Sequence, residues 1–468
     1  MRGGCERLTE TALTGICRTI FNWSDTAGNS DVAFGTHTKL QVWLGGELFD
    51  ITPSSGFTPG LVDGTGGAGY GTGAYSTGEY SEPSTEDYFP LTWSLAAWGE
   101  NLLANPRGQT IFAWDNATGT PAAAVTGAPA EVTAMLVSPT DQVFALGCNQ
   151  EVSGVFNPRC IRHSSVRDRG VWTTGAATTA REYILPGGGR IVGGRVIGES
   201  LLIWTNIGLF LGTFVGSLTQ PWRFDLVAEK CGLIGPNAAV VVGLRAFWIG
   251  PDLQVYAYSL GGGVSAVECP ILQAFVENMA ASQGDKIVAS STSTFQEIRF
   301  DYPDARDGTE NSRYLTLIIG GSDTGSWAQG EEARTAYVDA GPSGYPIAAD
   351  PAGRALWQER GQSNDGGPLS WFIETADQYL DENTTMMARA LWPDASEQVG
   401  AVDVTIYTRL TPQGEVTTKG PYAMAPGAGK VDIRATGRLF RVRFEGNSSP
   451  ASCRFGKPVF DLVAAGQR

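Results

Sequence analysis

The side chains most often used in catalysis are few and scattered in this chain. The 468 residues include two histidines, His37 and His163, which stand far apart and belong to no HExxH motif or His/Cys cluster. A zinc site is therefore not expected. No GxSxG elbow is present, and two histidines offer little material for a Ser-His-Asp triad. We expect both histidines to be polar strand or loop residues.

Carboxylates are abundant, so a glycosidase is the main enzymatic alternative. Such an enzyme needs two inward carboxylates at a fixed separation. The candidates on strands near the axis of the fold proposed below are Asp115, Asp225, Glu297 and Asp301. No spacing singles out a pair, and ordinary turn or solvated positions explain all four. The segment 304–311 resembles a calcium loop, but its spacing departs from the EF-hand pattern. We predict no catalytic residue, no metal and no cofactor.

The seven cysteines form no CxxC pair and are odd in number. They are expected to be small buried hydrophobic residues in a reducing compartment. Cys148 and Cys160 could close a loop by a disulfide, and the sequence leaves this possibility open.

The net charge is −15, which disfavours a protein that wraps nucleic acid, because phosphate binding needs clustered Lys and Arg. It is compatible with a channel through which double-stranded DNA passes without specific binding, and also with solubility alone. Basic residues gather near the C-terminal end, including Arg438, Arg441 and Arg443. Arg441 and Arg443 alternate with apolar residues, which places both on one sheet face. That face is either simply solvated or a docking patch for an acidic neighbour.

A repeated sequence pattern, which we call the repeated phrase, suggests which elements position these residues. An apolar run stops at a small or turn residue, and a second apolar run follows within a few positions. The copies end at Gly35, Gly147, Thr205, Gly250, Asp301 and Asp350. The last four positions lie 45, 51 and 49 residues apart. A period of about 40–50 residues with strand pairs inside each unit is typical of a propeller. With 61 Gly and 25 Pro, the chain is predicted to be all-β, with a β-propeller of about six blades over residues 1–362.

Two segments depart from this phrase. Residues 54–88 are rich in Gly and Tyr and then acidic, so they cannot build a core. They are either a plain insertion between strands or a protein-contact loop that uses Tyr70, Tyr75 and Tyr80. Pro270 opens a short helix, which we expect to place Ile271, Leu272, Phe275, Val276 and Met279 on one face that packs between blades.

After residue 362 the phrase is replaced by alternation of apolar and polar residues, as in Val402-Asp403-Val404-Thr405-Ile406. Alternation is typical of half-buried antiparallel strands. Residues 363–468 are therefore predicted to form a separate β-sandwich-like domain.

Several segments resemble one family of virion proteins. They are 34–40, 48–53, 231–237 with Phe247 and Trp248 after it, and 432–438. Together they resemble the tail hub or nozzle proteins of short-tailed bacteriophages, also called packaged-DNA stabilisation proteins. The resemblance covers most of the chain as a loose pattern, and none of its motifs is catalytic.

The resemblance implies a propeller followed by a β-sandwich-like domain. It implies a ring, commonly a hexamer, that lines the DNA channel below the portal and adaptor and contacts tail fibres or a tail needle. The expected location is the phage tail of the virion, after synthesis in the host cytoplasm. No apolar run reaches the ~18–20 residues of a membrane span, so no membrane insertion is expected. The alternatives are a propeller glycosidase and a carbohydrate-binding adhesin, both acting on host-surface polysaccharide.

Overall fold

The computed structural model describes residues 3–64, 89–187, 189–319, 326–379 and 384–467. The chain divides into two compact units. One is Leu8–Leu356, and the other joins Met1–Arg7 to Trp357–Arg468. This division falls six residues before the boundary predicted after residue 362.

The larger unit contains a series of four-stranded antiparallel sheets, which we call blades 1 to 6 in chain order. Blade 1 has β2 (Cys17–Ser24), β3 (Ser30–Thr36), β4 (Leu40–Leu44) and β5 (Glu47–Asp50); blade 2 has β6 (Trp93–Trp98), β7 (Asn101–Pro106), β8 (Phe112–Trp114) and β9 (Ala123–Ala124). Blade 3 has β10 (Val132–Val137), β11 (Val143–Asn149), β12 (Phe156–His163) and β13 (Arg181–Ile184); blade 4 has β14 (Ile191–Ile197), β15 (Ser200–Thr205), β16 (Gly208–Phe214) and β17 (Trp222–Glu229). Blade 5 has β18 (Ala239–Val242), β19 (Arg245–Ile249), β20 (Val255–Ser259) and β21 (Val264–Ala266); blade 6 has β22 (Val288–Thr292), β23 (Glu297–Pro303), β24 (Asn311–Ile318) and β25 (Ser326–Glu331).

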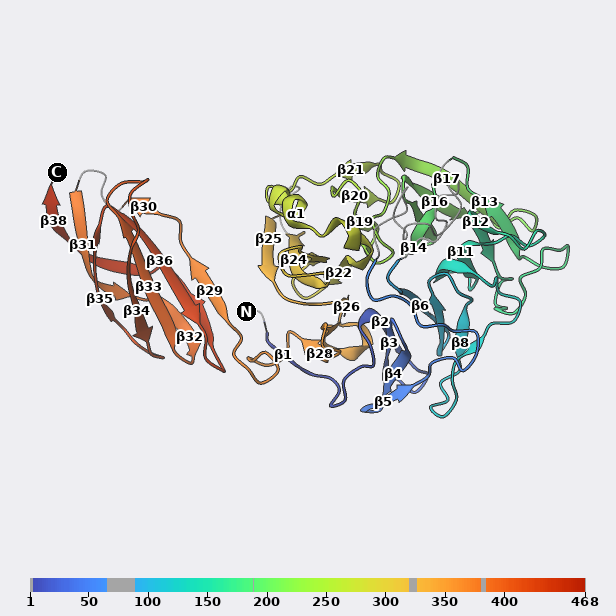
Figure 1. Ribbon diagram of the computed structural model, residues 1–468, viewed down its shortest axis with the longest axis horizontal. Coiled ribbons are helices and arrows are strands. Elements are labelled where there is room, and N and C mark those ends of the chain that lie inside the picture. Colours follow the sequence, from blue (N-terminus) through green and yellow to red (C-terminus); the bar gives the residue numbers. More distant parts are fainter. Residues whose placement is uncertain (1–2, 65–88, 188, 320–325, 380–383, 468) are drawn as a thin grey trace, which may run out of the picture. The chain divides into compact units, whose positions relative to one another are not determined.

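A seventh sheet, blade 7, has the order β1-β28-β27-β26. Its strands are β26 (Ala336–Val338), β27 (Ile347–Ala349), β28 (Ala355–Gln358) and β1 (Cys5–Arg7). Its fourth strand therefore comes from the other end of the sequence. The blades are arranged around a common centre, with strands such as β2, β6, β14 and β22 toward the inside (Figure 1). The all-β propeller is confirmed by these seven sheets.

The repeated phrase marks one position in the blade. Its copies at Gly35, Gly147, Thr205, Gly250, Asp301 and Asp350 lie in, or directly after, the second strand of blades 1, 3, 4, 5, 6 and 7. The described residues thus hold seven blades where about six were expected. Blade 2 was missed because its second strand, β7, ends in Asn105-Pro106 and lacks the phrase. The Asn105 side chain takes over the turn, donating to the carbonyl oxygen atoms of Pro106 and Gln109 at 3.1 and 2.8 Å.

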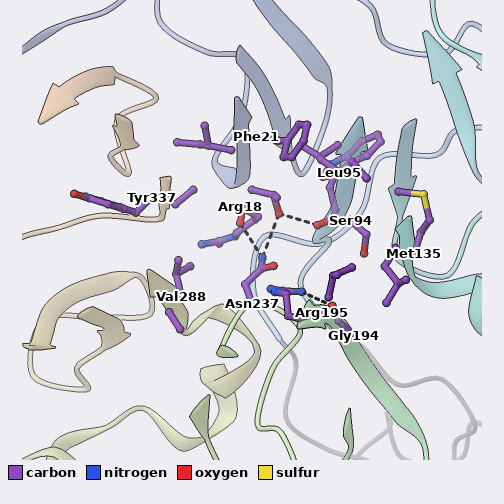
Figure 2. Close-up of a pocket in the computed structure, with 18 of the residues that line it drawn as sticks. Arg18, Phe21, Ser94, Leu95, Met135, Gly194, Arg195, Asn237, Val288 and Tyr337 are labelled. Atoms are coloured by element: carbon purple, nitrogen blue, oxygen red, sulfur yellow. Dashed lines mark hydrogen bonds between the residues drawn. The ribbon is translucent and has the colours of Figure 1, made fainter. Parts of the chain in front are cut away.

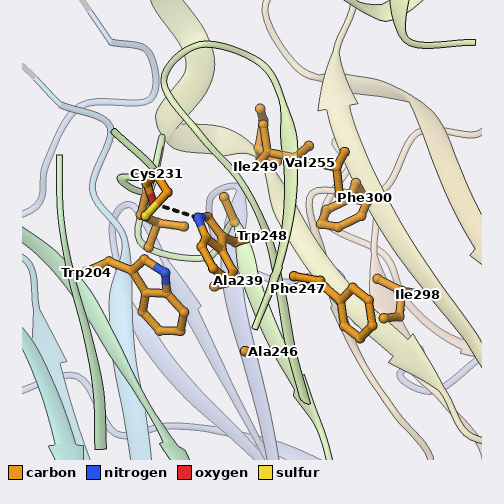
Figure 3. Close-up of a cluster of buried hydrophobic side chains, with 14 of the residues drawn as sticks. Trp204, Cys231, Ala239, Ala246, Phe247, Trp248, Ile249, Val255, Ile298 and Phe300 are labelled. Carbon is orange, nitrogen blue, oxygen red and sulfur yellow. Dashed lines mark hydrogen bonds between the residues drawn. The ribbon is translucent and has the colours of Figure 1, made fainter. Parts of the chain in front are cut away.

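The apolar sequence pattern of the second strands repeats because these strands are buried between neighbouring blades. The largest apolar cluster spans blades 4 to 6 and includes Trp204, Phe247, Trp248 and Phe300 (Figure 3). Indole Nε1 of Trp248 donates to the carbonyl oxygen of Cys231 at 2.9 Å, so its polar atom is satisfied. Fully burying each such side chain stabilises the fold by roughly 1.5–3 kcal/mol.

Helix α1 (Leu272–Asn278) joins blades 5 and 6, as predicted. Phe275 is buried against Tyr302 with ring centroids 4.7 Å apart, and Met279 is buried one turn later. Val276 was wrongly placed on this face, and it is 42% exposed. The reason is that Phe275 and Met279, four residues apart, define the core face, and the next position turns away from it. Two short 3₁₀ helices lie at Ala281–Lys286 and Gly341–Ser343.

The C-terminal unit has two main antiparallel sheets and a separate strand pair. The first sheet has β29 (Trp371–Glu374), β30 (Gln378–Tyr379), β33 (Val402–Arg409), β34 (Thr417–Met424) and β36 (Leu439–Gly446); the second has β31 (Thr384–Trp392), β35 (Val431–Gly437) and β38 (Val459–Gln467); the pair is β32 (Ala395–Val399) and β37 (Ser452–Phe455). The predicted alternation is confirmed, because burial alternates along β33, β35 and β36. Buried residues of both sheets form one apolar core.

Candidate functional site

A cavity of about 330 Å³ lies where the blades meet. It is lined by residues of the first strands β2, β6, β10, β14, β22 and β26 and by Asn237, just before β18. All seven blades therefore contribute to its wall, and we call it the axial cavity (Figure 2). No Asp or Glu is among the described residues that line it.

Asn237 ties four blades together at this wall. Its amide nitrogen donates to the carbonyl oxygen of Arg18 at 3.0 Å and to the hydroxyl of Thr19 at 3.2 Å. The Thr19 hydroxyl donates in turn to the carbonyl oxygen of Trp93 at 2.9 Å. The backbone N–H of Ala289 donates to the Asn237 carbonyl at 2.7 Å. The wall is thus held by polar contacts between blades 1, 2, 5 and 6.

Arg18 points from this wall into a cluster of four charges. Its Nη1 and Nη2 atoms donate to the two Glu310 carboxylate oxygen atoms at 2.6 and 2.8 Å. Lys286 Nζ donates to Glu310 Oε1 at 2.8 Å and also pairs with Asp63. Arg18 and Lys286 are 1% and 0% exposed. The two cations are matched by two carboxylates, so burial of this cluster leaves no net charge.

The same cluster holds the base of the 54–88 insertion. Arg18 Nη2 donates to the carbonyl oxygen of Val62 at 2.8 Å. The amide of Gln283 clamps Gly64, accepting from its N–H at 3.0 Å and donating to its carbonyl at 2.8 Å. The Leu91 N–H donates to the Leu61 carbonyl at 2.9 Å. The described residues on the two sides of the insertion, Leu61 to Gly64 and Leu91, are therefore held close together, beside Arg18 of the axial cavity wall. Tyr70, Tyr75 and Tyr80 lie outside the described residues.

Arg195, on β14, is the second cation of the cavity wall and lies in a different environment. Its Nη1 donates to the carbonyl oxygen of Gly194 at 2.9 Å and its Nη2 to that of Pro236 at 3.1 Å. No carboxylate pairs with it in the described part of the chain. Burial without a countercharge lowers the pKa of Arg195 to about 10, so the guanidinium is still charged at neutral pH.

The four carboxylates considered for a glycosidase are not brought together. Asp115 pairs with Arg169 at 2.8 Å and Asp225 with Arg223 at 2.7 Å, both with more than half of the carboxylate side chain exposed. Asp301 is buried in β23 against Arg299 at 2.6 Å, and Glu297 begins the same strand. They lie in or next to blades 2, 4 and 6, and none lines the axial cavity.

In segment 304–311, which resembled a calcium loop, the acidic side chains pair with arginines of this chain. Asp304 is buried and accepts from Arg306 Nη2 at 2.7 Å, while Asp307 accepts from Arg313 Nε at 2.8 Å. Hydrogen bonds to Arg306 lead the effects that hold the pKa of Asp304 below its usual value. Within the described residues, no group of three or more His, Cys, Asp or Glu is placed to hold a metal ion.

The two histidines, and the cysteines Cys148 and Cys160, are packed or hydrogen-bonded within the propeller. His163 is buried next to Phe144, and burial lowers its pKa to about 4. His37 Nδ1 accepts from the Ile16 N–H at 2.9 Å. Cys148 and Cys160 are both buried and free, so the disulfide that the sequence left open is not formed in this structure.

Arg441 and Arg443 lie on one face of β36, as the alternation predicted. Arg441 contacts Glu374 at 3.3 Å, and Arg443 contacts Glu445 at 3.0 Å and lies over the Phe372 ring. Arg438 donates its backbone N–H to the Arg409 carbonyl at 2.9 Å. The acidic neighbours of Arg441 and Arg443 thus belong to this chain, and a docking role for this face stays a prediction.

The axial cavity and its charged residues were not singled out from the sequence. A signal was present: Arg195 interrupts the apolar and glycine run Ile191-Val192-Gly193-Gly194, which resumes at Val196. A charged residue inside an apolar strand is rarely buried without a partner. The partners of Arg18 could not be foreseen, because Glu310 lies 292 residues away.

No protein-family model matches the chain, and no curated protein matches it. Solved structures similar to it include the β-propeller domain of Cps50 (Swd1) from Myceliophteria thermophila, at 11% identity and a TM-score of 0.44, covering 75% of this chain and 98% of that one. BBS1N in complex with ARL6DN matches at 10% identity and a TM-score of 0.43, covering 78% and 98%. The computationally designed Ika8 protein matches at 14% identity and a TM-score of 0.39, covering 75% and 99%. The propeller assignment rests on the seven sheets themselves.

Proposed function

We propose that this protein is a structural virion protein of a short phage tail. In this proposal several copies, commonly six, form a ring below the portal and adaptor, line the DNA channel and hold fibres or a needle. The observation that carries the proposal is the family resemblance of segments 34–40, 48–53, 231–237 and 432–438. All four lie in or directly beside strands: 34–40 in β3, β4 and their turn, 48–53 at the end of β5 and after it, 231–237 before β18, and 432–438 largely in β35.

The axial cavity supports one refinement of this proposal. The volume of this cavity is about 330 Å³. A double helix, in which the major groove alone is about 12 Å wide, is far too large to pass through a cavity of that size. A DNA channel would therefore have to be formed between copies of the chain. A net charge of −15 would keep the surface of such a channel from adhering to phosphates.

Exposed apolar residues favour contacts between copies at the outer edge of blades 3 and 4. We define the edge patch as Ile184, Phe214, Val215, Leu218 and Leu226, which are 40–70% exposed. The two blades are joined there by two contacts. Arg181 of β13 donates to the carbonyl oxygen of Thr219 at 3.1 Å, and the rings of Tyr183 and Phe224 pack with their centroids 5.1 Å apart. Ile184 and Leu226 lie on the outer strands β13 and β17, while Phe214 ends β16 and Val215 and Leu218 lie in the loop after it. Exposed apolar groups near an outer strand are typical of contact surfaces. We assign this patch to the neighbouring copy in the ring.

Mass photometry of the full-length chain tests the proposal. We expect a discrete ring-sized species in the wild type and a shift to monomers in the double variant Leu218→Asp/Leu226→Asp. Leu244→Asp is the matched control, because Leu244 is 56% exposed in the turn before β19, outside the patch. A wild type that is strictly monomeric at micromolar concentration and absent from purified phage particles would overturn the proposal.

A further inference from the structure

The axial cavity carries a positive charge that the described structure does not neutralise. Two cations line it, Arg18 and Arg195. Arg18 is matched by Glu310 within a balanced cluster, whereas the hydrogen bonds that Arg195 makes within the described residues go to backbone carbonyl oxygen atoms alone. An uncompensated charge in a low-dielectric site attracts an anion more strongly than the same charge would in water.

Arg195 has donors to offer such an anion. A guanidinium carries five N–H groups. Toward the described residues Arg195 uses two of them, on Gly194 and Pro236, which leaves three. The side chain keeps part of its surface accessible, and it lines the cavity beside Asn237 (Figure 2). The remaining donors are therefore within reach of a molecule in the cavity.

The rest of the wall limits what that molecule is. Leu95, Met135, Val196 and Val288 make much of it apolar, and Ser94 adds a hydroxyl group. The volume of about 330 Å³ equals roughly eleven water molecules at about 30 Å³ each. A small organic molecule with one charged end fits this combination, because its apolar part would contact aliphatic side chains.

We propose that the axial cavity binds a monovalent carboxylate carried on a small apolar body, with the carboxylate oxygen atoms on Arg195. A carboxylate matches the parallel N–H groups of a guanidinium. A phosphate dianion would meet only one uncompensated positive charge. The carboxylate belongs either to a free aliphatic acid or to the C-terminal end of a peptide. The proposal stands independently of the proposed assembly function.

Isothermal titration calorimetry of the full-length protein tests this site. The probes are hexanoate, its neutral analogue hexanamide, inorganic phosphate, and N-acetyl-Ala-Leu as a free acid and as an amide. We expect one saturable hexanoate site per chain and affinity at least about tenfold weaker for hexanamide, because the amide lacks the charge. If the dipeptide acid binds more tightly than hexanoate, the natural source is a peptide end, and the reverse order assigns a free acid.

Variants locate the site. Arg195→Gln is expected to weaken hexanoate binding at least about tenfold, and Arg195→Lys, which keeps the charge without the fork, by less. Arg223→Gln is the matched control, because Arg223 lies on the outer strand of the same blade and is 62% exposed, and it should leave binding unchanged. Circular dichroism checks folding, and should a variant fail to fold, the comparison of hexanoate with hexanamide on the wild type decides. No saturable hexanoate binding, equal binding by folded Arg195→Gln, or tighter binding of phosphate would each overturn the proposal.

Discussion

Arg18 and Arg195 line the same cavity, yet Arg18 is part of a balanced ionic cluster and Arg195 has no countercharge among the residues that the structure describes. Arg18 makes two hydrogen bonds to Glu310, whose second partner is Lys286. In the described part of the chain, Arg195 donates to two carbonyl oxygen atoms and to no other group. The attraction between buried partners offsets much of the cost of removing them from water, whereas a charge without a partner has no such compensation. Arg18 therefore fixes the wall and the base of the insertion, while Arg195 remains available to a ligand.

The largest effect is expected from Glu310→Gln. This change leaves Arg18 and Lys286, which are 1% and 0% exposed, with Asp63 as their remaining carboxylate partner. Breaking a buried ion pair by removing one partner costs about 3–5 kcal/mol. We expect a loss at the low end, about 3 kcal/mol, because Glu310 is 21% exposed. Urea unfolding followed by tryptophan fluorescence measures it.

The surface pair of Asp225 and Arg223 is the control for Glu310. Both side chains are more than half exposed, so Asp225→Asn should cost less than about 1 kcal/mol. A loss in Glu310→Gln no greater than in Asp225→Asn would remove the structural role assigned to the Arg18 cluster.

Asp31→Asn extends the comparison to a buried charge that does not line the axial cavity. Asp31 lies on β3, fully buried, and neither carboxylate oxygen has a hydrogen-bond partner among the described residues. Burial is the main cause that raises the pKa of Asp31 to about 6. At pH 7 the ionised carboxylate therefore destabilises the fold, and we expect Asn to raise the free energy of unfolding by about 1–3 kcal/mol. Chemical denaturation at pH 7 checks this gain.

The pH dependence of that gain follows from the direction of the pKa shift. Because the folded pKa of about 6 lies above the ordinary value of 3.8, the folded state binds the proton more tightly. Wild-type stability from this group is present below pH 4 and is lost as the pH rises through about 6. The advantage of Asp31→Asn should thus be small at pH 4 and grow to its full size by pH 7. An advantage that is constant across this range would contradict the assignment to Asp31.

The propeller could be predicted from sequence because second strands are buried between blades and so repeat an apolar run with a turn residue after it. Where a different residue takes the turn, as Asn105 does in blade 2, the repeat is missed. The cavity could not be predicted, because it depends on which first-strand residues meet at the centre. Pro236 reaches Arg195 across 41 residues and Glu310 reaches Arg18 across 292. The first pair depends on how two neighbouring blades pack, and the second on closure of the propeller, which brings blades 1 and 6 to a common centre.

The free energy of unfolding of Arg195→Met, measured without ligand against the wild type, tests the central contrast most directly. A largely buried ion without a countercharge carries a desolvation cost that an apolar side chain of similar size does not. We therefore predict equal or higher stability, within about 1 kcal/mol of the wild type. A loss of about 3 kcal/mol or more, as expected for a partnered buried charge, would contradict the conclusion that Arg195 is held for a ligand rather than for the fold.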